Sequence, residues 1–187
     1  MGINDKFFLD RSNAVLVVID VQEKLCRAMD DKVLDRLTGN ISILQEAAKE
    51  LAIPIVATEQ YVKGLGETLS PLKERLCAPA IEKMTFGCCG EAGFPDRLQS
   101  LGKKQVIVTG METHVCVLQT VLELLDAGYT VHLVKDAVMS RRKENWQVGV
   151  ETARDAGAVI TSTEAALFQL LKVAGTDEFK KLSKLVR

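Results

Sequence analysis

Three side chains in the sequence could together carry out acyl transfer: Asp20, Lys83 and Cys116. A cysteine attacks a carbonyl group as the thiolate, which a nearby ammonium group and the N-terminal end of a helix both favour. A carboxylate can take the proton from the sulfur and later give it to a leaving group. Backbone N–H groups between Gly110 and Cys116 could stabilise an oxyanion, at about 3 kcal/mol per donor. These groups are a complete set for a covalent hydrolase, provided that the fold brings them together.

Each of the three residues also has a structural interpretation. Asp20 ends an apolar run and could cap the helix that follows, a lone lysine is usually solvated, and a lone cysteine is usually a small buried hydrophobe. Histidine offers no better base, because His114 is two residues from Cys116 and would lie on the opposite face of a helix. His132 lies inside an apolar run and is interpreted as a core residue. A Cys-His protease arrangement and a zinc site are therefore disfavoured.

The elements that must position these residues alternate between strands and helices. Apolar, β-branched runs predict strands at 14–20, 53–59, 80–86, 104–110, 129–137 and 158–163. Helical periodicity predicts helices at 35–52, 93–102, 113–128, 141–157, 163–173 and 176–187. This alternation predicts a single α/β domain over residues 1–187, with a mostly parallel sheet between two layers of helices. Because ligands bind beyond the carboxyl ends of parallel strands, we expect Asp20, Lys83 and Cys116 on the same rim of the sheet.

The composition is that of an ordinary globular protein. Of the 187 residues 47% are hydrophobic, and the net charge of −1 gives no basic excess to attract nucleic acid or a membrane surface. The first residues, MGINDKFFLDRSN, carry charges where a signal peptide has its apolar core. Five cysteines without a disulfide pattern are typical of a reducing compartment, so we expect a cytoplasmic protein. Adjacent Cys88 and Cys89 are interpreted as loop thiols beside a pocket rather than as a metal or redox pair.

Several long motifs resemble the isochorismatase-like cysteine hydrolases and together cover nearly the whole chain. These motifs are VVIDVQ (17–22), IEKMTFG (81–87), VTGMETHVCVLQTVLELLDAGYTV (108–131), DAVMSR (136–141) and AGAVITSTEAALFQLL (156–171). The resemblance implies a Rossmann-like α/β/α sandwich with a six-stranded sheet in the order 3-2-1-4-5-6. It also implies a catalytic triad of Asp20, Lys83 and Cys116, a cis peptide bond between Met111 and Glu112, oxyanion donors at the backbone N–H groups of Glu112 and Cys116, and dimers or larger homo-oligomers.

Two departures from this family narrow the expected chemistry. Nicotinamidases of the superfamily carry a metal-binding aspartate and histidines after the second strand, whereas ATEQYVKGLGET (57–68) has no histidine. We therefore expect no metal and no other cofactor. Isochorismatases that cleave a vinyl ether lack the nucleophilic cysteine, which this chain has. The sequence is most similar to the isochorismatase-domain-containing and YcaC-like branch, whose substrates are poorly defined.

The expected function is hydrolysis of a small amide or a related acyl or C–N compound through a thioester on Cys116. Asp20 would act as base and then as acid, while Lys83 would hold Asp20 and stabilise the anionic states. Glu112 is expected to point away from the sulfur or to pair with a basic residue. Residues expected to line the substrate pocket are Gln22, Glu59, Gln60, Tyr61 and Phe86. Two alternatives stay open: a catalytically idle scaffold that binds other proteins, and a thiol redox protein in which Cys88 or Cys89 pairs with Cys116.

Overall fold

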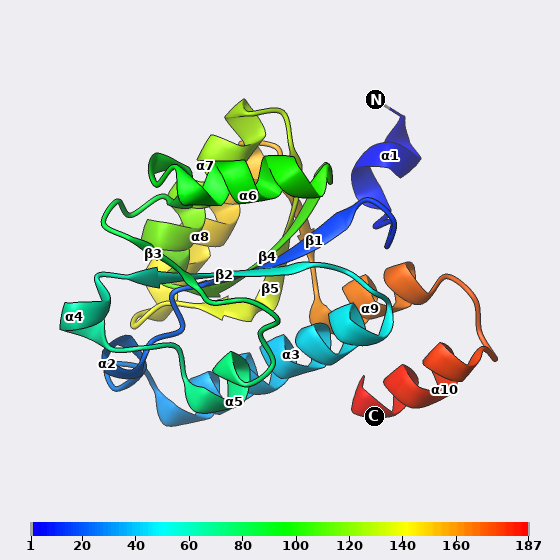
Figure 1. Cartoon of the computed structure of the whole chain (residues 1–187), viewed down its shortest axis with the longest axis horizontal. Coiled ribbons are helices and arrows are strands. Elements are labelled where there is room, and N and C mark those ends of the chain that lie inside the picture. The colour runs from blue at the N-terminus through cyan, green and yellow to red at the C-terminus, as the bar shows by residue number, and fades with distance from the viewer. Residues whose placement is uncertain (1, 187) are drawn as a thin grey trace.

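A computed structural model describes residues 2–186, and within them six strands form one parallel sheet in the order β3-β2-β1-β4-β5-β6. The strands are β1 (Ala14–Ile19), β2 (Ile55–Gln60), β3 (Ile81–Lys83), β4 (Gln105–Met111), β5 (Thr130–Met139) and β6 (Val159–Thr161). Helices cover both faces of the sheet (Figure 1). The expected α/β/α sandwich and its strand order are therefore confirmed.

The longer helices divide between the two faces of the sheet. One face is covered by α6 (Gly93–Leu101), α7 (Leu118–Asp126) and α8 (Lys143–Asp155), and the other by α3 (Asp31–Glu50) and α9 (Thr163–Leu171) (Figure 1). The remaining helices are short: α1 (Ile3–Phe7), α2 (Glu23–Cys26), α4 (Val62–Leu65), α5 (Ser70–Lys73) and α10 (Asp177–Leu182). Asp30 and Ser162 fix where α3 and α9 begin, because each side chain accepts a hydrogen bond from a backbone N–H of the first turn.

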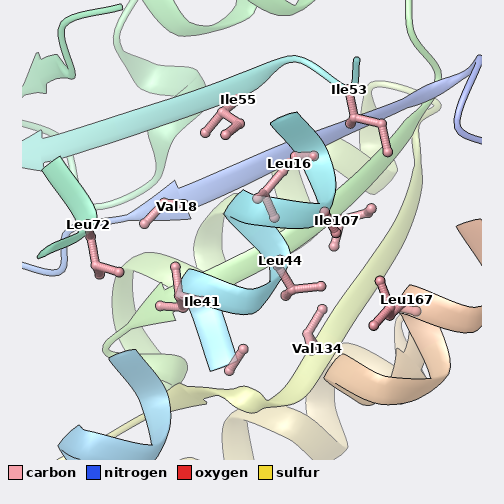
Figure 2. Packing of buried hydrophobic residues seen from close by; sticks show 14 of the residues in the cluster. Leu16, Val18, Ile41, Leu44, Ile53, Ile55, Leu72, Ile107, Val134 and Leu167 are labelled. Atoms are coloured by element: carbon pink, nitrogen blue, oxygen red, sulfur yellow. The ribbon is translucent and has the colours of Figure 1, made fainter. Parts of the chain in front are cut away.

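The continuous apolar runs are explained by burial of the sheet on both faces. In β1, Leu16 and Val18 belong to the core on the α3 side, whereas Val15, Val17 and Ile19 belong to the core on the α7 side. Figure 2 shows side chains of the first core gathered around α3 and α9, among them Leu16, Val18, Ile41, Leu44 and Leu167. A strand covered on both faces needs apolar residues at successive positions, and this pattern gave the correct strands from sequence.

The structure corrects several of the expected element boundaries. The third strand spans only three residues, because the chain turns after Lys83 and brings the carbonyl groups of Thr85 and Phe86 within hydrogen-bond distance of Lys83 Nζ. The helix expected at 113–128 begins with a π-helical turn (Thr113–Val117), which continues into α7. The helix expected at 176–187 ends at Leu182 and is followed by a 3₁₀ turn (Ser183–Val186); Arg187 lies outside the described residues.

The ends of β1 and β4 approach each other closely beside Asp20. Ile19 and Gly110 are paired in the sheet, and Gly110 has a φ of 117°. A Cβ atom at this position would lie 2.0 Å from the carbonyl oxygen of Ile19, so only glycine fits there. Asp20 itself has a φ of 51°, which turns the chain immediately at the carboxyl end of β1. Asp20 and Gly110 thus set the course of the backbone where β1 and β4 reach the candidate site.

Candidate active site

The structure brings Asp20, Lys83 and Cys116 together at the carboxyl ends of three strands. Asp20 directly follows β1, Lys83 ends β3, and Cys116 lies in the π-helical turn that follows β4. Lys83 Nζ is 2.7 Å from Asp20 Oδ2, and Asp20 acts on the Cys116 thiol, whose pKa it raises. Asp20 and Lys83 are fully buried, while 6% of Cys116 is exposed. The carboxylate is therefore paired with the ammonium group, and it interacts electrostatically with the thiol.

Further hydrogen bonds hold the buried carboxylate and ammonium groups in place. Thr58 in β2 donates its hydroxyl to Asp20 Oδ1 at 2.8 Å, so both carboxylate oxygens have a partner. Lys83 Nζ also donates to Gln60 Oε1 at 2.7 Å and to the carbonyl oxygen of Phe86 at 2.9 Å. Buried charges are tolerated when they are paired and hydrogen-bonded in this way. The Asp20–Lys83 pair thus has a fixed geometry.

The electrostatic surroundings of Cys116 differ from the sequence-based expectation. Burial raises the pKa of the Cys116 thiol, and the negative charge of Asp20 raises this pKa further, against the opposing effect of Lys83. The ammonium group of Lys83 directly contacts Asp20, so its charge is largely balanced there. These effects favour the protonated thiol over the thiolate. Asp20, whose charge acts on this thiol, is the candidate base.

The turn between β4 and Cys116 contains the cis peptide bond Met111–Glu112. The Glu112 side chain pairs with Arg141, whose Nε and backbone N–H donate to Glu112 Oε1 at 2.8 Å and 3.1 Å. Burial alone would raise the pKa of Glu112, but the hydrogen bonds and the charge of Arg141 outweigh it and hold this pKa below its usual value. The expected pairing of Glu112 with a basic residue is therefore found at Arg141.

One of the two histidines forms side-chain hydrogen bonds, and the other is buried in a strand. His114 Nδ1 is 3.0 Å from Ser140 Oγ, and its Nε2 is 3.2 Å from Asn145 Nδ2. His132 is fully buried in β5, and this burial lowers its pKa to about 4. The ring nitrogens of His114 are thus engaged by Ser140 and Asn145.

Three of the expected pocket residues form hydrogen bonds within the protein. Gln22 Nε2 donates to the carbonyl groups of Gln60 and Gly66, at 2.9 Å and 2.6 Å. Glu59 Oε1 accepts from the backbone N–H and the hydroxyl of Thr68, at 2.6 Å and 2.7 Å. Gln60 holds Lys83, as described above. These side chains therefore fix the 61–68 loop and the lysine.

The other two expected pocket residues are exposed to solvent. Tyr61 is 45% exposed and Phe86 is 56% exposed, so both are available to a ligand. Tyr61 has a φ of 39°, and its ring packs so closely on Gly64 that a Cβ atom there would lie 2.1 Å from it.

Thr58 and Cys88 are parts of the site that sequence reasoning missed or misplaced. Thr58 pairs with Ile19 in the sheet, which places its hydroxyl beside Asp20. The sequence signal for Thr58 was a hydroxyl at the end of an apolar strand. Cys88 was expected in a loop beside a pocket, but it is fully buried, with its Sγ 3.7 Å from Thr58 Oγ1.

One cavity borders the end of β2, and another borders β5 and β6. One, of about 420 Å³, lies between Glu59 and the 76–80 segment, and the other, of about 1110 Å³, extends from Phe7 and Phe8 along β6 to Ser140 and Arg141. Neither of these two cavities is lined by Asp20, Lys83 or Cys116.

Within residues 2–186, no group of three or more His, Cys, Asp or Glu side chains is arranged to hold a metal ion. None of the helices in this part of the chain is both long enough and apolar enough to span a membrane.

Residues 14–165 match the model of the isochorismatase domain, so the chain belongs to the isochorismatase family, whose members are hydrolases. The secreted isochorismatase effector Isc1 of Phytophthora sojae is 41% identical over 184 residues, which are 94% of this chain and 85% of that protein. The MAR1 ribonuclease structure from Caenorhabditis elegans is 36% identical and superimposes with a TM-score of 0.88, covering 96% of this chain and 92% of that one.

The YcaC gene product of Escherichia coli, described as an octameric hydrolase of unknown specificity, shares the fold. It has a TM-score of 0.89 at 24% identity, over 95% of this chain and 90% of that one.

Proposed function

We propose that this protein is a cysteine hydrolase that cleaves a small amide or a related acyl or C–N compound through a thioester on Cys116. The observation that carries the proposal is the position of the Asp20 carboxylate, which is buried between the Lys83 ammonium group and the Cys116 thiol. A carboxylate in this position can take a proton from the thiol and then hold it for a leaving group.

In the first half of the proposed reaction, Asp20 takes the thiol proton while Cys116 Sγ forms a bond to the carbonyl carbon. The raised pKa of Cys116 supports this timing, because a free thiolate would not accumulate before attack. The oxyanion would accept hydrogen bonds from the backbone N–H groups of Glu112 and Cys116. Collapse of this tetrahedral intermediate breaks the C–N bond. Asp20 gives the proton to the departing amine, and a thioester remains on the sulfur.

In the second half, a water molecule gives a proton to Asp20 and adds its oxygen to the thioester carbonyl. The C–S bond then breaks, the carboxylic acid is released, and the proton on Asp20 returns to the sulfur. Lys83 stays protonated throughout and balances the negative charge that moves between carboxylate and sulfur. Its further bonds to Gln60 and Phe86 support this role, since they keep the ammonium group at a fixed position.

Tyr61 and Phe86 are proposed as walls of the substrate site, because both are exposed and flank the loops that hold Lys83 and Gln60. Gln22, Glu59 and Gln60 support that site from behind rather than binding substrate. No cofactor takes part in the proposed reaction. A site with so little exposed sulfur favours a small substrate over a polymer.

The decisive experiment is a screen of small amides, ureides and hydroxamates with the wild type and the Cys116→Ala variant. Cys77→Ala is the matched control, because Cys77 is an exposed free cysteine. We expect turnover by the wild type and the Cys77→Ala variant and loss of turnover in Cys116→Ala. Equal turnover in Cys116→Ala would eliminate the covalent mechanism. Absence of turnover with every compound would favour the idle-scaffold alternative.

The name of the C. elegans relative introduces RNA as a second substrate class to be tested. A net charge of −1, from 24 basic and 25 acidic residues, gives this chain no general attraction to a polyanion. A single-stranded RNA oligonucleotide therefore belongs in the same screen, where we expect no cleavage.

We also propose that the chain forms one domain over residues 1–187 and assembles as a homo-oligomer. We further propose that it acts in the cytoplasm, without a nucleic-acid or membrane partner. The octameric assembly described for the E. coli YcaC protein supports an oligomer. Five free cysteines support a reducing compartment, although the P. sojae relative is a secreted protein. Light scattering after gel filtration tests the assembly, and fractionation of source cells tests the location.

A further inference from the structure

Cys88 lies behind the candidate base and connects it to the segment that carries the nucleophile. It is fully buried at the start of the 3₁₀ turn Cys88–Gly90. Cys88 Sγ is 3.7 Å from Thr58 Oγ1, and Thr58 Oγ1 is 2.8 Å from Asp20 Oδ1. Cys88 therefore reaches the carboxylate through a single hydroxyl group.

The direction of both hydrogen bonds follows from the groups involved. An ionised carboxylate can only accept, so the one hydroxyl hydrogen of Thr58 is donated to Asp20. The Thr58 oxygen then has lone pairs left, and the S–H group of Cys88 is the donor to it. Burial, assisted by the negative charge of Asp20, raises the pKa of Cys88 to about 12, so this thiol keeps its hydrogen at the pH of an ordinary assay.

The backbone of Cys88 is held from the other side of the site. Its N–H donates to Thr120 Oγ1 at 3.0 Å, and the Thr120 hydroxyl donates to the carbonyl oxygen of Cys116 at 2.6 Å. The preceding residue, Gly87, packs against Glu123, where a Cβ atom would lie 2.1 Å from a carboxylate oxygen. The position of the Cys88 thiol is thus fixed relative to both the nucleophile and the base.

We propose that Cys88 is a positioning residue, whose S–H group donates to Thr58 and thereby orients the hydroxyl that Thr58 donates to Asp20. This inference rests on the proposed function for its catalytic consequence, but the hydrogen bonds themselves do not depend on it. Hydrogen bonds in a chain polarise one another, so the thiol strengthens the bond from Thr58. A stronger donor favours the ionised form of the carboxylate, which is the form that can take the proton from Cys116.

Kinetic measurements on Cys88→Ala and Thr58→Val test the catalytic consequence. Cys88→Ala should lower kcat about two- to threefold with little change in KM, because one weak neutral hydrogen bond is lost. Thr58→Val removes a hydrogen bond to a charged group and should lower kcat about tenfold or more. In both variants the acidic limb of the pH profile of kcat/KM should move to higher pH. Thr58→Ser keeps the hydroxyl, so it should lose less activity than Thr58→Val and shift the acidic limb of the pH profile less.

A double-mutant cycle separates this role from simple packing. Because Cys88 acts through Thr58, Cys88→Ala should have no further effect on the pH profile in the Thr58→Val background. A cavity effect would instead add to the loss in that background. Cys26→Ala is the matched control: Cys26 is also buried but belongs to the core on the other face of the sheet, so its removal should leave the pH profile unchanged.

Infrared spectroscopy tests the hydrogen bond without any substrate. The S–H stretching band of Cys88, isolated as the difference between wild type and Cys88→Ala, should move to higher wavenumber in Thr58→Val, where its acceptor is absent. The proposal would be overturned by an S–H band that does not move. It would also be overturned if the effects of Cys88→Ala and Thr58→Val on the pH profile were additive in the double variant. If the band moves but the wild type turns over no substrate, the hydrogen bond is supported and the proposed hydrolase function is what fails.

Discussion

Lys83 Nζ and Asp20 Oδ2 are 2.7 Å apart, although their strands, β3 and β1, are separated in the sheet by β2. Neither side chain is accessible to solvent, so each charge depends on the other and on the hydrogen bonds from Thr58 and to Gln60. Removal of one member of such a pair leaves an uncompensated buried charge, which is strongly destabilising. The pair therefore contributes to both the stability and the proposed chemistry of the protein.

Lys83→Met should lower the free energy of unfolding by roughly 3–5 kcal/mol, because Asp20 then remains buried without its counter-charge. The double variant Asp20→Asn/Lys83→Met should recover most of this loss. Denaturant unfolding at neutral pH measures both effects. Lys73→Met is the control: its ion pair with Glu67 is exposed and screened by solvent, so its loss should have little effect on stability. A double variant no more stable than Lys83→Met would contradict this account of the pair.

Asp20→Asn should make the Cys116 thiol more acidic while it abolishes turnover. The substitution removes the negative charge that helps to raise the pKa of Cys116, and it leaves the positive charge of Lys83 without its partner. The ultraviolet absorbance of the thiolate, corrected with Cys116→Ala in the same background, should appear at lower pH than in the wild type. Loss of a positioned base typically lowers a rate about 10²- to 10⁴-fold. Titration of Cys116 at an unchanged or higher pH would refute the electrostatic part of the account.

Arg141→Met should slow the alkylation of Cys116 by iodoacetamide. In this variant the carboxylate of Glu112 keeps the hydrogen bond from the backbone N–H but loses the one from Nε and the positive charge beside it, so its negative charge opposes formation of a thiolate. Glu112→Gln in the Arg141→Met background removes that charge and should restore the rate. Peptide mass spectrometry at successive times gives the rate for Cys116 itself. Equal rates in the single and double variants would show that the Glu112 charge does not act on the sulfur.

His132 should make the protein less stable in acid. Its pKa is lowered from 6.5 to about 4 by burial, so the stability linked to the neutral ring is fully present above pH 6.5 and is lost as the pH falls toward 4. A shift of this size corresponds to about 3 kcal/mol. The denaturant midpoint of the wild type should fall over this pH range more than that of His132→Leu. Parallel pH dependences in the two proteins would rule out the histidine as the cause.

The sequence predicted the sheet and the position of the three reactive residues because both follow from local patterns. Apolar runs without alternation predicted strands buried on both faces, and the strand-end rule then placed Asp20, Lys83 and Cys116 on one rim. The short third strand was not predictable in this way, because it ends where Lys83 bonds to carbonyl groups of the chain after it.

Properties that depend on contacts between distant segments were not visible in the sequence. The raised pKa of Cys116 arises from burial and from Asp20, which is 96 residues earlier in the chain. The hydrogen bonds that join Cys88, Thr58 and Asp20 connect three different segments. Similarly, Gln22 and Glu59 were expected to face a pocket, and only the structure gives their hydrogen-bond partners.

The covalent intermediate on Cys116 is the central claim, and rapid-quench mass spectrometry with an activated ester such as p-nitrophenyl acetate tests it most directly. The Cys77→Ala background removes the exposed thiol that would otherwise react. We predict an initial burst of nitrophenolate equal to the enzyme concentration and a single acetyl group that maps to Cys116, both absent in Cys116→Ala. An acetyl group on another residue, or an equal burst in Cys116→Ala, would contradict the account.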